Sequence, residues 1–277
     1  MVALTGCSAL ESIPYSPSTS PEAWLTMQPY AEIQIASETI LVVQPSTSAI
    51  VYLLGVVTIL AGLYFFKIRG AEKSRVWWGI ALLLWGVGAL FAGSSYEAFS
   101  YQLKCAGWEL CTWTHWLEVA YLIVSLGSVD AMMVAEAYAC TIGKWRKWLI
   151  RFAWGSFSLY LLLVLVGSFV PVKFLISFEM LLLFAAPNVV IFLILNGRRY
   201  RQSRGRMDLA LLGVWGWLIV TISAYFLYYV LGISETLWAR GIWFTENDVL
   251  HIFLIIWMVY IAVVVAPAVK DESISSV

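Results

Sequence analysis

Polar side chains that can bind a metal ion or move a proton gather at the ends of three hydrophobic segments. They are serines, carboxylates, an amide and the only two histidines of the chain: Ser94, Ser95, Glu97, His115, Glu118, Asn247, Asp248 and His251. Ionisable groups near membrane depth are costly to bury, so they are usually paired or functional. These residues are therefore the first candidates for a site.

The spacing of these residues places them in pairs on single helix faces, because positions three or four apart are neighbours on a helix. Imidazole and carboxylate together suit zinc with an open position for water, and the metal lowers the pKa of that water. A metal-assisted hydrolysis is thus one chemistry that the pattern predicts. The pairs are Ser94 with Glu97, His115 with Glu118, Asp248 with His251, and Asn247 with His251.

A purely structural interpretation stands beside this one. Residues at a helix end reach interfacial water, which accounts for Glu97, His115 and Glu118 without any site. Asp248, near a helix start, can simply cap the helix and favour its dipole. His251 lies about one turn deeper and fits this interpretation least well.

The composition shows which elements must hold these groups. Hydrophobic residues make up 61% of the 277 positions and charged residues 12%, whereas a soluble domain carries about 25% charge. An all-α integral membrane protein is therefore expected, without a nucleic-acid partner. Seven apolar runs are each long enough to span a bilayer, and they cover residues 49–66, 76–95, 113–139, 149–170, 174–195, 209–231 and 248–266.

The charges between these runs predict the orientation of the seven-helix bundle. Three alternate loops and the C-terminal tail carry 14 of the 17 lysines and arginines, and the other loops carry Lys104, Lys173 and Arg240. By the positive-inside rule, the N-terminus lies outside and the C-terminus in the cytosol. The candidate residues then share one level, in the outer leaflet.

The chain divides into three parts by composition. Residues 1–46 contain five prolines and no lysine or arginine, and we predict an extracytosolic tail with an interfacial helix near 22–40. Residues 47–268 form the transmembrane domain, and 269–277 a cytosolic tail. Cys105 and Cys111 lie in an outer loop, where a short disulfide is expected; two unpaired thiols are the alternative.

The sequence does not contain the motifs of several functions that are common among seven-helix and transport proteins. The last segment has no lysine at its centre for a retinal Schiff base, and no phosphate-binding loop or pair of broken helices is present. Haem ligation by His115 and His251 has no further support.

The seven spans, the outside N-terminus and the positions of these polar groups resemble the CREST superfamily. That superfamily includes the alkaline ceramidases and the progestin and adiponectin receptors. Its pattern is a serine and a histidine in the second span, an aspartate near the third, and His-x-x-x-His in the last. Here Ser94 or Ser95 resembles the serine and His251 the last histidine, while Asn247 stands at the other histidine position.

The resemblance implies a multi-pass membrane hydrolase that acts on a lipid amide or ester. Zinc would be held by His251 with the substituted ligands Asp248 and Glu97. The remaining candidates would serve the reaction: Ser94 or Ser95 by steadying the oxyanion, and Glu118 or His115 by orienting the attacking water. The alternatives are a non-enzymatic receptor or sensor that binds a lipid-like ligand in the same place, and a membrane protein without a catalytic site.

Overall fold

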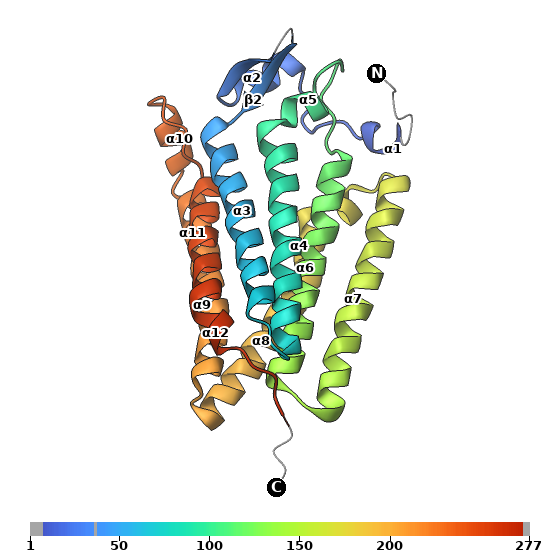
Figure 1. The fold of residues 1–277 in the computed structure, drawn as a ribbon. Helices are drawn as coiled ribbons and strands as arrows, with labels where there is room; N and C mark the ends of the chain where they lie inside the picture. Colours follow the sequence, from blue (N-terminus) through green and yellow to red (C-terminus); the bar gives the residue numbers. More distant parts are fainter. Residues whose placement is uncertain (1–7, 36–37, 274–277) are drawn as a thin grey trace.

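Seven long helices form the body of the protein in a computed structural model, which describes residues 8–35 and 38–273 (Figure 1). Each is long and apolar enough to cross a membrane, which confirms the predicted seven-helix all-α class. The spans are α3 (Pro45–Lys67), α4 (Lys73–Ala92) with η1 (Gly93–Ala98), α6 (Trp116–Cys140), α7 (Gly143–Phe169), α8 (Phe178–Ser203), α9 (Arg206–Val230), and α11 (Glu246–Tyr260) with η3 (Ile261–Val265) and α12 (Ala266–Ala268).

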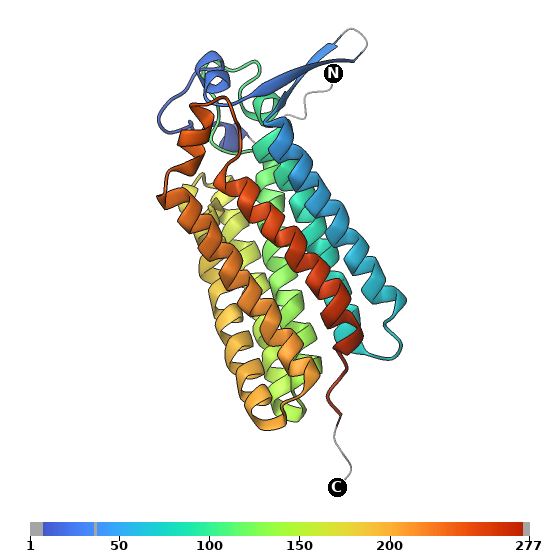
Figure 2. The same cartoon turned by 90° about the vertical axis from the view of Figure 1, so that its left-hand side faces the viewer.

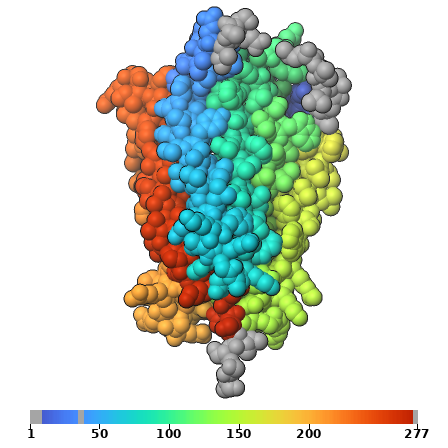
Figure 3. All heavy atoms as spheres, viewed as in Figure 1, coloured from blue at the N-terminus to red at the C-terminus, as the bar shows by residue number. Residues whose placement is uncertain are grey.

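The helices run side by side along one axis, with α1 (Ser8–Glu11) at one end and α12 at the other (Figures 1 and 2). Helix α4 packs on both α3 and α6, and α11 packs on α9 and α3. In the space-filling view, side chains of α3, α4 and α6 adjoin along one face of the bundle (Figure 3). We call the end that carries α1 the outer end, following the orientation that the loop charges predict.

Large apolar side chains cover the outside of the bundle as well as its interior. Leu60, Leu162 and Leu183, on three different spans, are each more than half exposed. Such helices have no driving force to hide their apolar faces when lipid surrounds them, so packing and polar contacts hold the bundle together. This surface is that of a multi-pass membrane protein.

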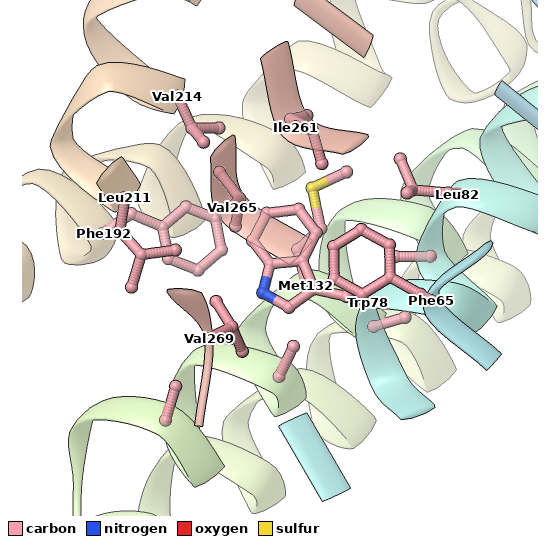
Figure 4. Close-up of a cluster of buried hydrophobic side chains, with 14 of the residues drawn as sticks. Phe65, Trp78, Leu82, Met132, Phe192, Leu211, Val214, Ile261, Val265 and Val269 are labelled. Atoms are coloured by element: carbon pink, nitrogen blue, oxygen red, sulfur yellow. The ribbon is translucent and has the colours of Figure 1, made fainter. Parts of the chain in front are cut away.

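A large apolar cluster fills the interior toward the predicted cytosolic end, with side chains from α3, α4, α6 and the last span. Phe65 and Trp78 stack there with their ring centroids 6.1 Å apart. Met132 and Val265 lie close to these rings in Figure 4, and all four side chains are fully buried. Apolar side chains fill the interior of the bundle at this end, whereas the predicted site residues lie at the other end.

The outer end is covered by the N-terminal segment rather than by the expected helix 22–40, which is wrong beyond its first turns. Only α2 (Pro21–Thr26) is helical, and a hairpin of β1 (Tyr30–Ile35) and β2 (Glu38–Val43) follows. The run 38–43 is rich in β-branched residues, which favour strands over helices. Pro29, with its fixed φ and missing N–H, also stands where a continuing helix would need a donor.

The predicted disulfide between Cys105 and Cys111 is confirmed. It closes the loop after α5 (Ser100–Lys104) and lies in a small apolar cluster with Trp24 and Val43. The N-terminal segment is tied to this loop by backbone hydrogen bonds from Tyr15 to Cys111 and from Cys111 to Thr19. The disulfide loop and the N-terminal segment therefore form one cover over the helix ends.

Two shorter elements complete the outer end, namely η2 (Lys173–Ile176) and α10 (Ile233–Trp238). At the opposite end, the chain after α12 crosses the helix ends. The carboxylate of Asp271 accepts hydrogen bonds from the backbone N–H groups of Lys73 and Ser74 at 2.9 and 2.8 Å. Arg199 joins Asp208 and Glu272, each at 2.8 Å. These contacts close the bundle at the predicted cytosolic end.

Candidate functional site

The second span ends in a wider helical turn that carries three of the predicted site residues. Gly93–Ala98 forms the π-helix η1, a geometry that is often found at functional sites. The hydroxyls of Ser94 and Ser95 donate back to the carbonyls of Leu90 and Phe91, both at 2.8 Å. Such bonds from serine to the preceding turn bend a helix. The turn places Glu97 in the interior, where it is 6% exposed.

Neither serine is presented as a free hydroxyl. Ser94 also lies 2.9 Å from the hydroxyl of Tyr52 on α3, which fixes its orientation. Ser95 is fully buried and its hydrogen goes to Phe91. The oxyanion role expected from the sequence stays a prediction, and it would require either hydroxyl to leave its present partner.

Glu118, in the first turn of α6, is held by a buried lysine. Its Oε1 accepts from Nζ of Lys104 at 2.7 Å, and the two side chains are only 3% and 7% exposed. Lys104 Nζ also lies 5.3 Å from the centre of the Tyr96 ring, a distance typical of a cation–π contact. Glu118 is therefore a paired group in the interior, and the interpretation that it reaches interfacial water is wrong.

Asp248 and His251 lie on the inward side of the start of α11. Asp248 is fully buried, and its Oδ2 accepts from the backbone N–H of Thr245 at 2.6 Å in a capping box. The capping interpretation is thus confirmed for this oxygen. The other oxygen, Oδ1, has no hydrogen-bond partner within the described chain, and neither has Nδ1 of His251.

The structure brings Glu97 to the same level as Asp248. Asp248 and Lys104 both lie within electrostatic range of Glu97. Oε2 of Glu97 is buried and likewise finds no partner among residues 8–35 and 38–273. We call Glu97, Lys104, Glu118, Asp248 and His251 the outer polar cluster.

The predicted zinc ligands are of suitable types but are not arranged as a ready metal centre. Among the residues that the structure describes, no three side chains of histidine, cysteine, aspartate or glutamate are placed to hold one metal ion. Glu97, Asp248 and His251 would have to move toward one another first.

His115 stands apart from the carboxylates of the last span. It is the N-cap of α6, where Nδ1 accepts from the backbone N–H of Leu117 at 3.3 Å. The charged groups that act on it are Lys104 and Glu11. With Glu11 and Trp108 it lines a separate cavity of about 100 Å³ below α1. The structure therefore does not place His115 with Asp248 and His251.

A family model matches residues 47–268, which is most of the chain, and its description is a family of unknown function, DUF6962. The chain belongs to the DUF6962 family. No curated protein matches it significantly, and no solved structure does so either.

The DUF6962 match contains the whole outer polar cluster. All five of its residues fall between positions 47 and 268, whereas Glu11 and the hairpin of the N-terminal cover lie before the matched region. The cluster is thus part of the family domain, and of the cover only the disulfide loop falls within the matched region.

Lys104 is the residue of this DUF6962 site that sequence reasoning missed. In the sequence it is one of three cations in the outer loops, and such a lysine is expected to be exposed. A usable signal was present, because Lys104 directly precedes Cys105. In the structure both cysteines of the disulfide are buried, and so is the adjacent Lys104.

The stability of this DUF6962 protein is expected to fall in acid partly because of His115. Burial and the nearby charge of Lys104 lower the pKa of His115 below its usual value, against a smaller opposing effect of Glu11. Below about pH 6.5 the unfolded state then binds the proton first, so folding is penalised by at most about 1.4 kcal/mol per pH unit. The penalty is absent at higher pH.

Substitution His115→Asn isolates this effect, because asparagine retains an N-cap acceptor but does not titrate. Unfolding free energies of both proteins in detergent micelles are measured between about pH 7 and about pH 5. We expect the wild type to lose more stability than the variant over this interval. Equal losses would show that His115 does not contribute.

Proposed function

We propose that this protein binds a lipid-like molecule through the outer polar cluster and acts as a seven-helix membrane receptor or sensor. Glu97 Oε2, Asp248 Oδ1 and His251 Nδ1 are buried side-chain atoms without a partner in the described chain, and they lie at the outer ends of the second and seventh spans. An unpaired buried polar atom costs about 1–3 kcal/mol, so three together favour a partner from outside.

The charges of the cluster favour a ligand that is cationic or rich in hydrogen-bond donors. Three carboxylates, Glu97, Glu118 and Asp248, stand against one ammonium, that of Lys104, and that ammonium is already bound to Glu118 at 2.7 Å. Burying the remaining negative charge without compensation is expensive. A ligand ammonium between Glu97 and Asp248 would supply both charge and donors.

The position of the cluster favours a ligand with an apolar chain. The cluster lies at the outer ends of α4 and α11, the level at which lipid head groups meet the hydrocarbon core. The outer faces of the spans are apolar, and the N-terminal cover lies over the helix ends. A molecule that enters from the lipid side presents its polar group at this depth.

A metal-dependent lipid hydrolase of CREST type is the second candidate function. The observation in its favour is that the same three free atoms, two carboxylate oxygens and an imidazole nitrogen, are the donors that zinc takes. It requires the side chains to converge on a metal ion. The resemblance carried by His251 and Ser94 or Ser95 adds to it.

Binding of a fluorescent long-chain primary amine to the purified protein in nanodiscs tests the receptor proposal. We expect saturable binding that Glu97→Gln weakens by about 10–100-fold, the value of one charge-assisted hydrogen bond. Glu235→Gln, at an exposed glutamate of α10, should leave it unchanged, and the same chain bearing a carboxylate should not bind. Equal affinity in both variants would refute the proposal.

Metal analysis of the same preparations separates the two candidates. About one zinc ion per chain in the wild type, lost in His251→Ala, would favour the hydrolase over the receptor. Its absence together with saturable amine binding supports the receptor. Neither zinc nor amine binding would refute both.

A further inference from the structure

We propose a second lipid site, for an anionic glycerophospholipid, on α8 at the end of the bundle opposite the outer polar cluster. A groove of about 330 Å³ opens there on the surface of the helix. It lies at the end predicted to face the cytosol. The groove is lined by Leu193, Ile194, Gly197, Arg198 and Arg201.

The order of these residues along α8 matches the two ends of a phospholipid. They are spaced so that all five share one side of the helix. The apolar members, Leu193 and Ile194, come first, and the two arginines lie toward the helix end at Ser203. The stripe is about 12 Å long at 1.5 Å per residue. An acyl chain and its head group can therefore lie along it in the orientation that the bilayer imposes.

Some arginines at this end of the bundle already have partners within the protein, and others have none in the described chain. Arg199 is bound to Asp208 and Glu272 and donates to the carbonyl of Cys140 at 3.0 Å. Arg204 lies over the ring of Tyr200 at 5.6 Å.

Arg198 and Arg201 form no ion pair within the described chain, and both are exposed. They stand three residues apart on the groove. Two guanidinium groups in this arrangement can bind one phosphate through several charge-assisted hydrogen bonds.

Gly197 keeps the groove open between its apolar and basic parts. A Cβ atom at this position would meet no atom within 4 Å, so the space beside the helix is empty of protein. A side chain at this position would extend from that Cβ atom into the groove. Substitution of this glycine is therefore expected to block the site without removing a charge.

The charge of the groove favours an anionic lipid over a zwitterionic one. The groove offers two free positive charges beside apolar side chains and no carboxylate lining. Basic grooves at the cytosolic ends of spans bind acidic lipid head groups, which the inner leaflet supplies. A zwitterionic lipid would bring its own cation and gain less.

Native mass spectrometry of the full chain, released from nanodiscs, tests the proposal. Nanodiscs of phosphatidylcholine with phosphatidylglycerol are compared with phosphatidylcholine alone. We expect one phosphatidylglycerol to be retained by the wild type, and Arg198→Gln with Arg201→Gln to reduce retention at least about tenfold. Gly197→Leu, which keeps every charge, should reduce it as well.

The matched control is Arg204→Gln with Arg206→Gln, which removes the same charge from the same end but outside the groove. Retention in this variant should remain as in the wild type, with thermal unfolding confirming that all variants are folded. Equal losses in the two double variants would show general electrostatic attraction and overturn the site. Retention unaffected by Gly197→Leu would likewise contradict the groove.

Discussion

Replacing Lys104 with methionine is expected to destabilise the protein by about 3–5 kcal/mol, the cost of leaving one partner of a buried ion pair alone. Glu118 would lose the ammonium that now lies 2.7 Å from Oε1, and its side chain is only 3% exposed. Unfolding of the purified protein by SDS in mixed micelles measures the effect. Lys173→Met, at an exposed outer lysine, should cost no more than about 1 kcal/mol.

The double variant of Lys104→Met and Glu118→Gln distinguishes a charge effect from lost packing. Removing both charges leaves no unpaired ion, so the double variant should regain most of the stability that the single variant loses. If the two effects simply add, the ion pair is not the cause. The amine-binding assay on the double variant also shows whether Lys104 serves the site or only the fold.

Substitution Gly86→Ala is expected to destabilise the bundle by about 1–3 kcal/mol, although alanine is the better helix former. A Cβ atom at Gly86 would lie 2.6 Å from Cγ1 of Ile59 and 2.9 Å from the carbonyl oxygen of Gly55. The second of these is backbone, so α3 and α4 would have to separate. Close approach of two spans through small residues is a common source of packing energy in membranes.

Gly155→Ala is the matched control, since it makes the same chemical change in a long helix. A Cβ atom there would meet nothing within 4 Å. The variant should be as stable as the wild type or up to about 1 kcal/mol more stable. SDS unfolding of both variants tests the pair, and equal effects at the two glycines would contradict close packing of α3 on α4.

The seven spans could be predicted from the sequence because a bilayer imposes a local requirement. About twenty consecutive apolar residues are needed to satisfy every backbone group inside the membrane, whatever the neighbours are. The disulfide could also be predicted from local sequence, because Cys105 and Cys111 are only six positions apart in one loop. The hairpin was missed because short apolar runs in a proline-rich segment fit a strand or a helix, and pairing decides between them.

For the candidate site, too, the features that could be predicted from the sequence are the local ones. Residue types, spacing along one helix and depth in the membrane are local properties, and they singled out Glu97, Glu118, Asp248 and His251. The sequence also placed His115 with them, because helix ends at one level look equivalent when positions around the bundle axis are unknown. In the structure His115 caps α6 and lines another cavity.

What the chain determines by itself is therefore the number of spans, their apolar surface and the level at which its polar groups lie. Only the tertiary structure decided which of these groups meet. It assigned Lys104 to Glu118, tied both serines to their own helix and left one atom each of Glu97, Asp248 and His251 without a partner. The physical reason is that pairing depends on how helices are rotated and packed, and that rotation results from contacts between residues far apart in the chain.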